Sequence, residues 1–331
     1  MRESKHAAQM PQIHKWRQEG LSFGEIAKRL GEKYKQNVHR PYQFWLSQGN
    51  GGIVTIGKKR YVQIGVGKSR SKMTIGDVPK PVQQGGQLWL VIGCVHRPFH
   101  NQVLWKKLLQ LAQWLGPKLY GVVIAGDYLD MASLSFHDKG KLPVVEGLDL
   151  SFEYADGLRG IRELTDATSA ATIRHFIYGN HEDRFFRGRR DVDTRKLSLP
   201  EPADALYLDE LGYQVHRNWQ EDYVTLGSHL DVMHGLYTCE HAAKKHLANI
   251  GGSALFFHTH RFQVHIEGDR AAYNCGWLGD INAQAFRYQG RMQRRRWREG
   301  FALAHIDDRG DYFVNPISCY NNKFFALGRM F

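Results

Sequence analysis

Short apolar runs alternate with helical periodicity from residue 87 onward. The runs Leu88–Val95, Gly121–Ala125 and Thr172–Tyr178 have the length and composition of buried strands. Between them, Asn101–Leu115 and Gly157–Thr168 repeat their apolar residues at helical spacing. This alternation of strands and helices predicts an α/β fold.

The remainder of the chain is richer in strands, and none of its apolar runs approaches the ~18–20 residues of a membrane-spanning helix. The N-terminus is polar and lacks the apolar core of a signal peptide. The four cysteines show no paired spacing of the kind that marks a disulfide framework or zinc ribbon. We therefore expect a cytoplasmic protein with no membrane partner. The later predicted strands are Tyr223–Leu226, Leu230–His234, Ala254–His258, Phe262–Ile266 and Phe301–Ile306.

Two short helices are predicted near the N-terminus. Pro11–Glu19 begins with a proline that suits a first helical turn, and Ser22 with Glu25 forms a capping box for Phe23–Leu30. Residues 20–31 resemble the first two-helix portion of a helix-turn-helix domain. A third helix can begin at Pro41, but residues 31–40 make a longer connection than the usual ~3–4 residues. That length counts against a third helix that reads a DNA groove.

A β-hairpin is predicted after these helices, with strands Ile53–Ile56 and Tyr61–Ile64. Its connection carries Lys58, Lys59 and Arg60, which would contact phosphates as in a winged-helix arrangement. The alternative is a small helical module that docks on the rest of the chain or on a partner protein.

The net charge of +12 is concentrated in the first quarter of the chain. Residues 1–90 hold 16 Lys+Arg against 5 Asp+Glu, whereas residues 91–331 hold 29 against 28. This asymmetry indicates a polyanion-binding appendage on a nearly neutral body, although a merely solvated basic segment is the alternative. We expect a binding module over residues 1–76, a linker rich in Pro and Gly over 77–86, and a catalytic domain over 87–331.

Residues that can bind metals follow five of the predicted strands. In open α/β sheets, ligands gather at the carboxyl ends of strands, so these residues indicate one site. Each motif alone is a weak signal, and their combination in this order is a strong one. The motifs are Cys94-Val95-His96, Gly126-Asp127-Tyr128-Leu129-Asp130, Gly179-Asn180-His181-Glu182, Met233-His234-Gly235 and His258-Thr259-His260.

This series resembles the pattern DxH, GDxxD, GNH(E/D), H and GHxH of the calcineurin-like metallophosphoesterase superfamily, over roughly residues 88–261. The resemblance implies two mixed sheets sandwiched between helices, with a dinuclear metal centre at the strand ends. It also implies that His181 is catalytic, contacting the scissile phosphate and assisting the leaving group. The implied metal ligands are His96 and His260 with Cys94 for the first metal, Asp127 for both, and Asn180, His234 and His258 for the second.

The chemistry of the residues agrees with these roles. Two cations ~3.5–4 Å apart need a shared anionic ligand such as Asp127, and a bridging water that loses a proton supplies the nucleophile. Asp130 is expected to orient a ligand, with a helix N-cap as the alternative.

Two positions depart from the pattern of the superfamily. Cys94 replaces the usual Asp, and a thiolate favours zinc or iron over manganese. Cys94 is therefore either a true ligand or a neighbour of a weakly held first metal. Phe257 stands where glycine is usual, but both neighbouring histidines are retained. The expected cofactors are two divalent metal ions, manganese by default, and zinc or iron where Cys94 ligates.

The substrate class is less constrained by the motifs. The segment after Asp130 lacks the arginine of the protein-phosphatase pattern GDxVDRG, although Arg184 could bind phosphate instead. Residues 286–298 hold six Arg with Tyr and Trp and no acid, which suits phosphate contacts and base stacking. Arg294, Arg295 and Arg296 are therefore candidate nucleic-acid contacts. The alternative is a solvated helical face whose Phe286, Tyr288 and Trp297 pack inward.

Together these features predict a metal-dependent phosphodiesterase that acts on nucleic acid, with DNA expected rather than RNA. The body resembles the repair nucleases of the superfamily and phage-encoded phosphoesterases. One alternative is a phosphomonoesterase or small-nucleotide phosphodiesterase. Another is a nucleic-acid-binding protein whose phosphoesterase domain is degenerate.

Overall fold

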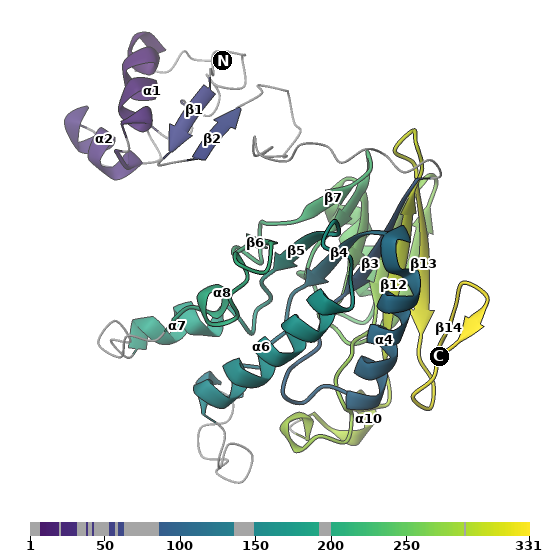
Figure 1. Ribbon diagram of the computed structural model, residues 1–331. Helices are drawn as coiled ribbons and strands as arrows, with labels where there is room; N and C mark the ends of the chain where they lie inside the picture. Colours follow the sequence, from purple (N-terminus) through teal and green to yellow (C-terminus); the bar gives the residue numbers. More distant parts are fainter. Residues whose placement is uncertain are drawn as a thin grey trace. The chain divides into compact units, whose positions relative to one another are not determined.

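The chain divides into two compact units, Met1–Pro81 and Val82–Phe331 (Figure 1). Among the residues that the structure describes, no helix is both long enough and apolar enough to cross a bilayer. The computed structural model describes residues 7–19, 21–31, 38, 42, 53–56, 59–62, 86–135, 149–191, 200–287 and 289–331.

The first unit begins with a 3-10 turn, η1 (Ala7–Gln9), and the helices α1 (Met10–Gln18) and α2 (Phe23–Arg29). The predicted capping box is confirmed. The hydroxyl of Ser22 accepts from the Glu25 amide at 3.3 Å, and the Glu25 carboxylate accepts from the Ser22 amide at 2.7 Å. A small core holds the two helices together, formed by Met10, Ile13, Ile26, Ala27, Val38 and Tyr42.

The predicted hairpin is present as β1 (Ile53–Ile56) and β2 (Lys59–Val62), antiparallel, with Ile56 opposite Lys59. The second strand begins two residues earlier than predicted. Placing Lys59 and Arg60 in the connection was therefore wrong, since both lie in β2. Lys58 lies outside the described residues, as does most of the third helix predicted from Pro41.

The second unit is built on two mixed sheets. The first sheet has the order β13-β12-β3-β4-β5-β6, in which β3, β4, β5 and β6 run parallel and β12 and β13 are antiparallel to their neighbours. Its strands are β3 (Gln87–Ile92), β4 (Leu119–Ala125), β5 (Ile173–Ile177), β6 (Tyr213–His216), β12 (Gly300–Ile306) and β13 (Tyr312–Ser318).

The second sheet has the order β10-β11-β9-β8-β7, with β11, β9 and β8 parallel and both edge strands antiparallel. Its strands are β7 (Val224–Leu226), β8 (Leu230–Val232), β9 (Ser253–Phe256), β10 (Phe262–Glu267) and β11 (Arg270–Cys275). The parallel cores of the two sheets therefore both present carboxyl ends of strands, which is where the predicted ligands lie.

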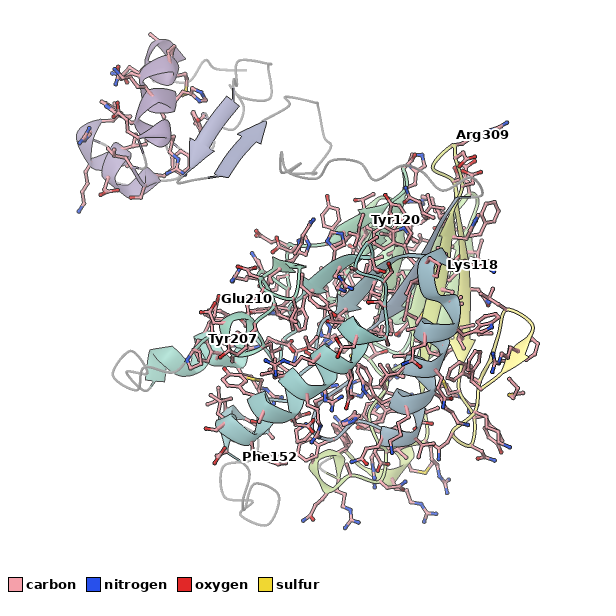
Figure 2. All side chains as sticks on the ribbon, in the orientation of Figure 1. Lys118, Tyr120, Phe152, Tyr207, Glu210 and Arg309 are labelled. Carbon is pink, nitrogen blue, oxygen red and sulfur yellow. The ribbon has the colours of Figure 1, made fainter. Side chains whose placement is uncertain are left out.

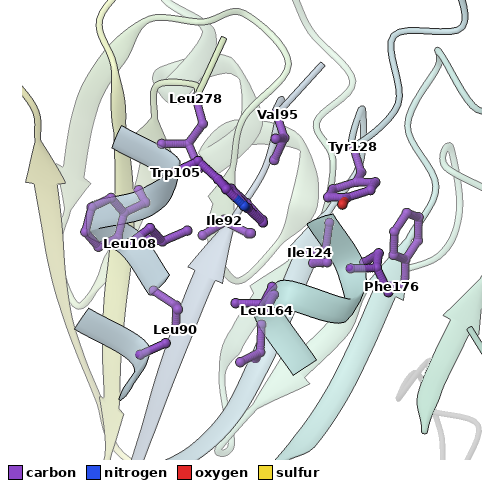
Figure 3. Packing of buried hydrophobic residues seen from close by; sticks show 14 of the residues in the cluster. Leu90, Ile92, Val95, Trp105, Leu108, Ile124, Tyr128, Leu164, Phe176 and Leu278 are labelled. Carbon is purple, nitrogen blue, oxygen red and sulfur yellow. The ribbon is translucent and has the colours of Figure 1, made fainter. Parts of the chain in front are cut away.

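Successive side chains of a strand point to opposite faces of the sheet, so the buried residues of the first sheet pack in two separate layers. Leu90, Ile92 and Ile124 pack under the helices α4 (Gln102–Leu115) and α6 (Leu150–Asp166), with Trp105 and Leu164 contributed by those helices (Figure 3). The intervening positions of β3 and β4 face the second sheet and join its residues in a separate cluster.

The outer face of the second sheet is covered by α9 (Ala242–Ile250), whose Ala243 and Leu247 pack on Phe256. The order of layers is thus helix, sheet, sheet, helix, and the predicted fold class is confirmed. Large apolar side chains such as Phe152 and Tyr207 remain exposed on the outside of this unit (Figure 2).

Several elements escaped the sequence analysis. Strands β6, β11 and β13 and helix α9 were not predicted, and α6 begins seven residues before the predicted Gly157, at an N-cap formed by Asp149. The shorter elements are α7 (Arg184–Asp191), α8 (Pro202–Ala205), α10 (Arg291–Arg294), η3 (Gly116–Lys118), η4 (Ala132–Leu134), η7 (Gln284–Phe286), β14 (Phe325–Ala326) and β15 (Arg329–Met330).

Candidate metal centre

The predicted ligands meet where the carboxyl ends of the two parallel sets of strands face each other. Cys94 and His96 follow β3, Asp127 follows β4, and Asn180 follows β5. From the other sheet, His234 follows β8, while His258 and His260 follow β9. All seven side chains thus enter one site from five strand ends, as the sequence predicts.

One set of donor atoms surrounds His234. Its Nε2 lies 2.9 Å from Asn180 Oδ1, 3.0 Å from His258 Nδ1 and 3.3 Å from Asp127 Oδ2. The other ring nitrogen, Nδ1, faces the Ala125 carbonyl at 3.2 Å, which can only accept a hydrogen bond. In the neutral ring Nε2 therefore carries a lone pair, and it faces the side-chain oxygens of Asn180 and Asp127 and a ring nitrogen of His258.

A second set surrounds His96. Its Nδ1 lies 2.9 Å from Asp130 Oδ2, so this nitrogen carries the proton and Nε2 carries the lone pair. That lone pair lies 2.9 Å from His260 Nε2. The thiol of Cys94 lies within 4.8 Å of the donor atoms of both histidines.

Asp127 connects the two sets. Its Oδ2 lies 3.3 Å from His234 Nε2 and 3.9 Å from His96 Nε2. The lone pairs of His234 Nε2 in the neutral ring and of the Asn180 and Asp127 oxygens converge and repel one another, and a divalent cation removes that repulsion. The residues present therefore fit two cations that share one carboxylate, and the nitrogen, oxygen and sulfur donors suit zinc, iron or manganese.

The backbone at the site adopts an unusual conformation. Cys94, His96, Asp127, His258 and His260 all have positive φ, between 47° and 61°. Residues with a Cβ visit this left-handed region rarely, and such residues cluster at functional sites. The conformation is held by hydrogen bonds between loops, from the Cys94 amide to Gly126 O and from the His96 amide to Asp127 O, each 2.9 Å long.

Two glycines leave room for the ligands. A Cβ at Gly126, where φ is +80°, would collide with the ring of His234. A Cβ at Gly179 would collide with the carboxylate of Asp127. Gly93 likewise leaves room for the ring of Phe257, because a Cβ at Gly93 would lie only 2.5 Å from that ring.

Glu182 is a buried residue beside the candidate ligands, and the sequence analysis quoted it in its motif without assigning it a role. The buried carboxylate accepts from the amides of Asp127 at 3.0 Å, Leu129 at 2.8 Å and Gly179 at 2.7 Å. Burial and the charge of Asp127 raise the pKa of Glu182 to about 7. Glu182 thus joins the loops after β4 and β5 and fixes the backbone that presents Asp127.

Asp130 contacts the ligands and does not cap a helix. Its carboxylate binds His96, and the following 3-10 turn, η4, begins without a side-chain cap. Its carbonyl accepts from His181 Nδ1 at 2.6 Å and from Arg184 Nη1 at 2.8 Å. Asp130 therefore holds the His96 ring and also positions His181 and Arg184, and its role in orienting a metal ligand stays a prediction.

His181 faces the centre through its other ring nitrogen. Because His181 Nδ1 donates a hydrogen bond to the Asp130 carbonyl, Nε2 is an acceptor. It lies 3.1 Å from Arg184 Nη2 and 3.8 Å from Asp127 Oδ2. Burial, opposed by Asp127 and reinforced by Arg184, lowers the pKa of His181 to about 3. The ring is therefore neutral near neutral pH.

The pKa values of two candidate ligands, Asp127 and Cys94, shift in opposite directions. Burial disfavours the charged form of Asp127, but the imidazoles of His181, His234 and His96 together hold its pKa well below its usual range. Burial and the charge of Asp127 raise the pKa of Cys94 well above its usual value. The sulfur accepts from the His258 amide at 3.1 Å.

A pocket of about 380 Å³ opens onto these ligands. Next to it, His260 stacks on Trp277 with ring centroids 4.5 Å apart, and Trp297 meets the same histidine edge to face at 4.6 Å. Phe286 is buried behind them. Phe286 and Trp297 thus pack inward, as one sequence alternative had it, while Tyr288 lies outside the described residues.

The arginines of this segment differ in their surroundings. Arg294 donates from Nε to Gln289 O and from Nη1 to Ile281 O, both at 3.1 Å. Arg296 pairs with Glu240 at 3.2 Å, and Arg295 is exposed. Their contact with nucleic acid stays a prediction, as does that of Lys58, Lys59 and Arg60.

No protein-family model and no curated protein matches this sequence. Solved structures with a similar arrangement include zinc-bound Vps29 from Entamoeba histolytica, 12% identical over 74% of this chain and 96% of that one, with a TM-score of 0.37. Vps29 from Cryptosporidium parvum is 14% identical over 74% and 94%, with a TM-score of 0.36. A conserved Streptococcus pneumoniae protein described as a predicted phosphoesterase is 12% identical over 67% and 84%, with a TM-score of 0.27. Similarities this low support neither an activity nor a partner for this chain.

Proposed function

We propose that this protein is a dinuclear-metal-dependent phosphodiesterase that hydrolyses nucleic acid. The observation that carries the proposal is the pair of donor sets that share Asp127 Oδ2, one around His234 and one around His96. Pairs of divalent cations bridged in this way occur in nucleases and phosphatases, where they clamp the attacking and leaving oxygens of a phosphoester.

The protein's own residues would prepare the reaction. When bound, the two cations supply the charge that polarises a phosphate and activates water. The Asp127 carboxylate is held in one orientation because Oδ1 accepts from the His181 amide at 2.9 Å. Arg184 Nη2 donates to His181 Nε2, and a phosphate oxygen in the pocket would compete for the same guanidinium. Arg184 would then bind the phosphate and leave His181 Nε2 facing the leaving group.

The nucleic-acid part of the proposal is supported by charge. The excess of basic residues lies in the first ninety residues, where α1, α2 and the β1–β2 hairpin form a separate compact unit. Such an excess suits a phosphate backbone, and we propose DNA as the polymer and the cytoplasm as the location.

The test compares labelled single- and double-stranded DNA with a chromogenic small phosphodiester, each with Mn²⁺ or Zn²⁺. We expect metal-dependent hydrolysis of DNA, lost on chelation and strongly reduced in Asp127→Asn. Turnover of the small diester alone, without DNA binding at moderate salt, would contradict the nuclease proposal and favour the small-nucleotide phosphodiesterase.

Cys94 favours a second candidate, a nucleic-acid-binding protein with a degenerate centre. Its thiol is fully buried, and burial raises its pKa, which disfavours the thiolate that a metal needs. The discriminating variant is Cys94→Asp. If the wild type is inactive with every metal and Cys94→Asp gains activity, the second candidate is correct.

A further inference from the structure

A nearly uncharged wall faces the metal ligands across the pocket. The volume of about 380 Å³ falls in the range of ~300–1,000 Å³ typical of small-ligand sites. Arg261 is the one charged residue of this wall, and its Nη1 donates to Cys239 O at 3.1 Å. The wall is formed by Thr238, Thr259, Arg261, Gln289, Gln293 and Trp297.

The wall is held in place by residues behind it. The Arg294 side chain donates to the carbonyls of both Ile281 and Gln289, and these two hydrogen bonds fix the backbone of Gln289. The Arg296–Glu240 pair ties the same segment to the loop that follows His234. The guanidinium groups that the sequence analysis assigned to phosphate thus help to shape the pocket.

The groups that face the pocket suit a nucleobase better than a phosphate. In the described part of the chain, the side-chain amides of Gln289 and Gln293 have no hydrogen-bond partner, so each offers two donors and one acceptor. Trp297 is half-buried, and its indole lines the pocket beside His260. Amides bind base edges and indoles stack on base faces, whereas a phosphate is bound most strongly by cations.

We propose that this wall, through Gln289, Gln293 and Trp297, binds the unpaired base of the nucleotide whose phosphodiester reaches Asp127. The preferred substrate is therefore single-stranded nucleic acid or an unpaired end. A base inside a duplex is stacked on both faces and has its pairing edge occupied, so it must leave the helix to enter such a pocket. This inference rests on the proposed function, and exposed Arg291 and Arg295 supply charge for the neighbouring phosphates.

The first test measures binding and does not depend on catalysis. Fluorescence anisotropy of the full chain compares a single-stranded oligonucleotide with an abasic strand of equal length and charge, and with a duplex of the same sequence. We expect the wild type to prefer the strand with bases by about tenfold, and Trp297→Ala to lose most of that preference. Trp297→Phe should retain part of it because an aromatic face remains. Met292→Ala, at an exposed position of α10 five residues before Trp297, is the matched control.

The second test uses two chromogenic diesters with the same leaving group, p-nitrophenyl thymidine 5′-phosphate and methyl p-nitrophenyl phosphate. The ratio of their kcat/KM values should fall about tenfold in Trp297→Ala and several-fold in Gln293→Ala. If neither diester is hydrolysed but the base preference persists in the binding assay, the proposed function is wrong and the base-binding pocket is still supported. A base preference unchanged in both variants, or equal binding of duplex and single strand, would overturn the base pocket.

Discussion

At the scale of single residues, Cys94 is the one sulfur donor among the seven candidate ligands. Its sulfur lies within reach of His96 and His260 and accepts one backbone hydrogen bond. Deprotonation of the buried thiol becomes favourable only beside a cation, because burial and Asp127 otherwise raise its pKa. A sulfur ligand would make the first metal position softer than the second, which is built from nitrogen and oxygen donors.

Cobalt substitution tests this ligand directly. Co²⁺ bound to a thiolate absorbs in the near ultraviolet, so the cobalt protein should show a sulfur-to-metal charge-transfer band. We expect Cys94→Ser to lose the band, and Cys94→Asp to bind cobalt without it. Cys275→Ser is the control, since Cys275 is also a buried thiol but belongs to none of the groups of possible metal donors among the described residues. A band that survives in Cys94→Ser would show that the thiol is no ligand.

Glu182 gives a second prediction at this scale. In Glu182→Gln, an amide nitrogen replaces one carboxylate oxygen. This nitrogen cannot accept from the backbone amides that donate to Glu182 in the wild type. We expect a loss of about 1–3 kcal/mol in unfolding free energy for each donor left unsatisfied. Metal affinity should also fall about 10–100-fold, because Asp127 loses its support. Urea unfolding of the metal-free protein and a Zn²⁺ titration measure the two effects.

The matched control for Glu182 is Asp183→Asn, which makes the same change in charge one residue away. Asp183 pairs with Arg187 on the surface, and such pairs contribute little. If both variants bind Zn²⁺ like the wild type, Glu182 does not support the ligand loop.

At the scale of elements, β5 and β6 carry a pair of partly buried imidazoles. His175 Nδ1 lies 3.2 Å from His216 Nε2. Burial, with the charge of His216 acting in the same direction, lowers the pKa of His175 to about 3. The unfolded chain binds this proton near pH 6.5 and the folded chain does not. Acidification below about pH 6.5 therefore favours unfolding through this pair.

His175→Gln should reduce that pH dependence. One such site contributes about 1.4 kcal/mol per pH unit between its two pKa values, so the unfolding free energy of the variant should fall less steeply from about pH 6 to pH 4.5. Chemical denaturation at each pH measures the slope. Exposed His229→Gln should keep the slope of the wild type. Equal slopes in wild type and His175→Gln would mean that folded His175 takes up the proton.

The elements also show what the sequence could and could not predict. The strands β3 and β4 are nearly continuous apolar runs, and β5 places Arg174 and His175 between apolar residues. All three strands were predicted, together with the candidate ligands that follow them. Strands β6 and β13 are sheet edges with mixed polarity, and β13 contains Pro316, which edge strands tolerate. The role of Glu182 was missed because its partners are backbone amides from separate loops, which no spacing along the chain reveals.

Helix α6 was predicted to begin at Gly157, whereas it begins at Leu150, directly after its N-cap Asp149. Gly157 and Gly160 lower helix propensity, yet a Cβ at Gly157 would strike Leu129, and one at Gly160 would strike Arg97. Packing of the helix against the loops that carry the site thus overrides local propensity. This close approach is a property of the folded chain, and the helical pattern alone does not contain it.

At the scale of the whole molecule, charge and chemistry are separated along the chain. The ligands, Glu182 and the pocket all belong to the second unit, whose residues are nearly neutral in sum. Under the proposed function, hydrolysis of a small diester should need only that unit, whereas capture of a long polyanion would draw on the basic first unit. The two functions should therefore respond to different substitutions.

A triple variant in the full chain, Lys58→Ala with Lys59→Ala and Arg60→Ala, tests this separation. If these three residues contact phosphates, the slope of log Kd against log salt should flatten by about 2–3, since each contact contributes ~0.9. Hydrolysis of the methyl diester should stay at the level of the wild type, because the metal ligands lie in the other unit.

The control removes three exposed charges from the second unit, by alanine at Lys106, Lys118 and Arg309. It lowers the net charge by the same amount, so a salt slope that flattens equally in both variants would indicate a general effect of net charge. A loss of small-diester hydrolysis in the hairpin variant alone would show that the first unit contributes to the chemistry. A slope that changes only with the hairpin, at constant diester hydrolysis, is the result that the distribution of charge along this chain predicts.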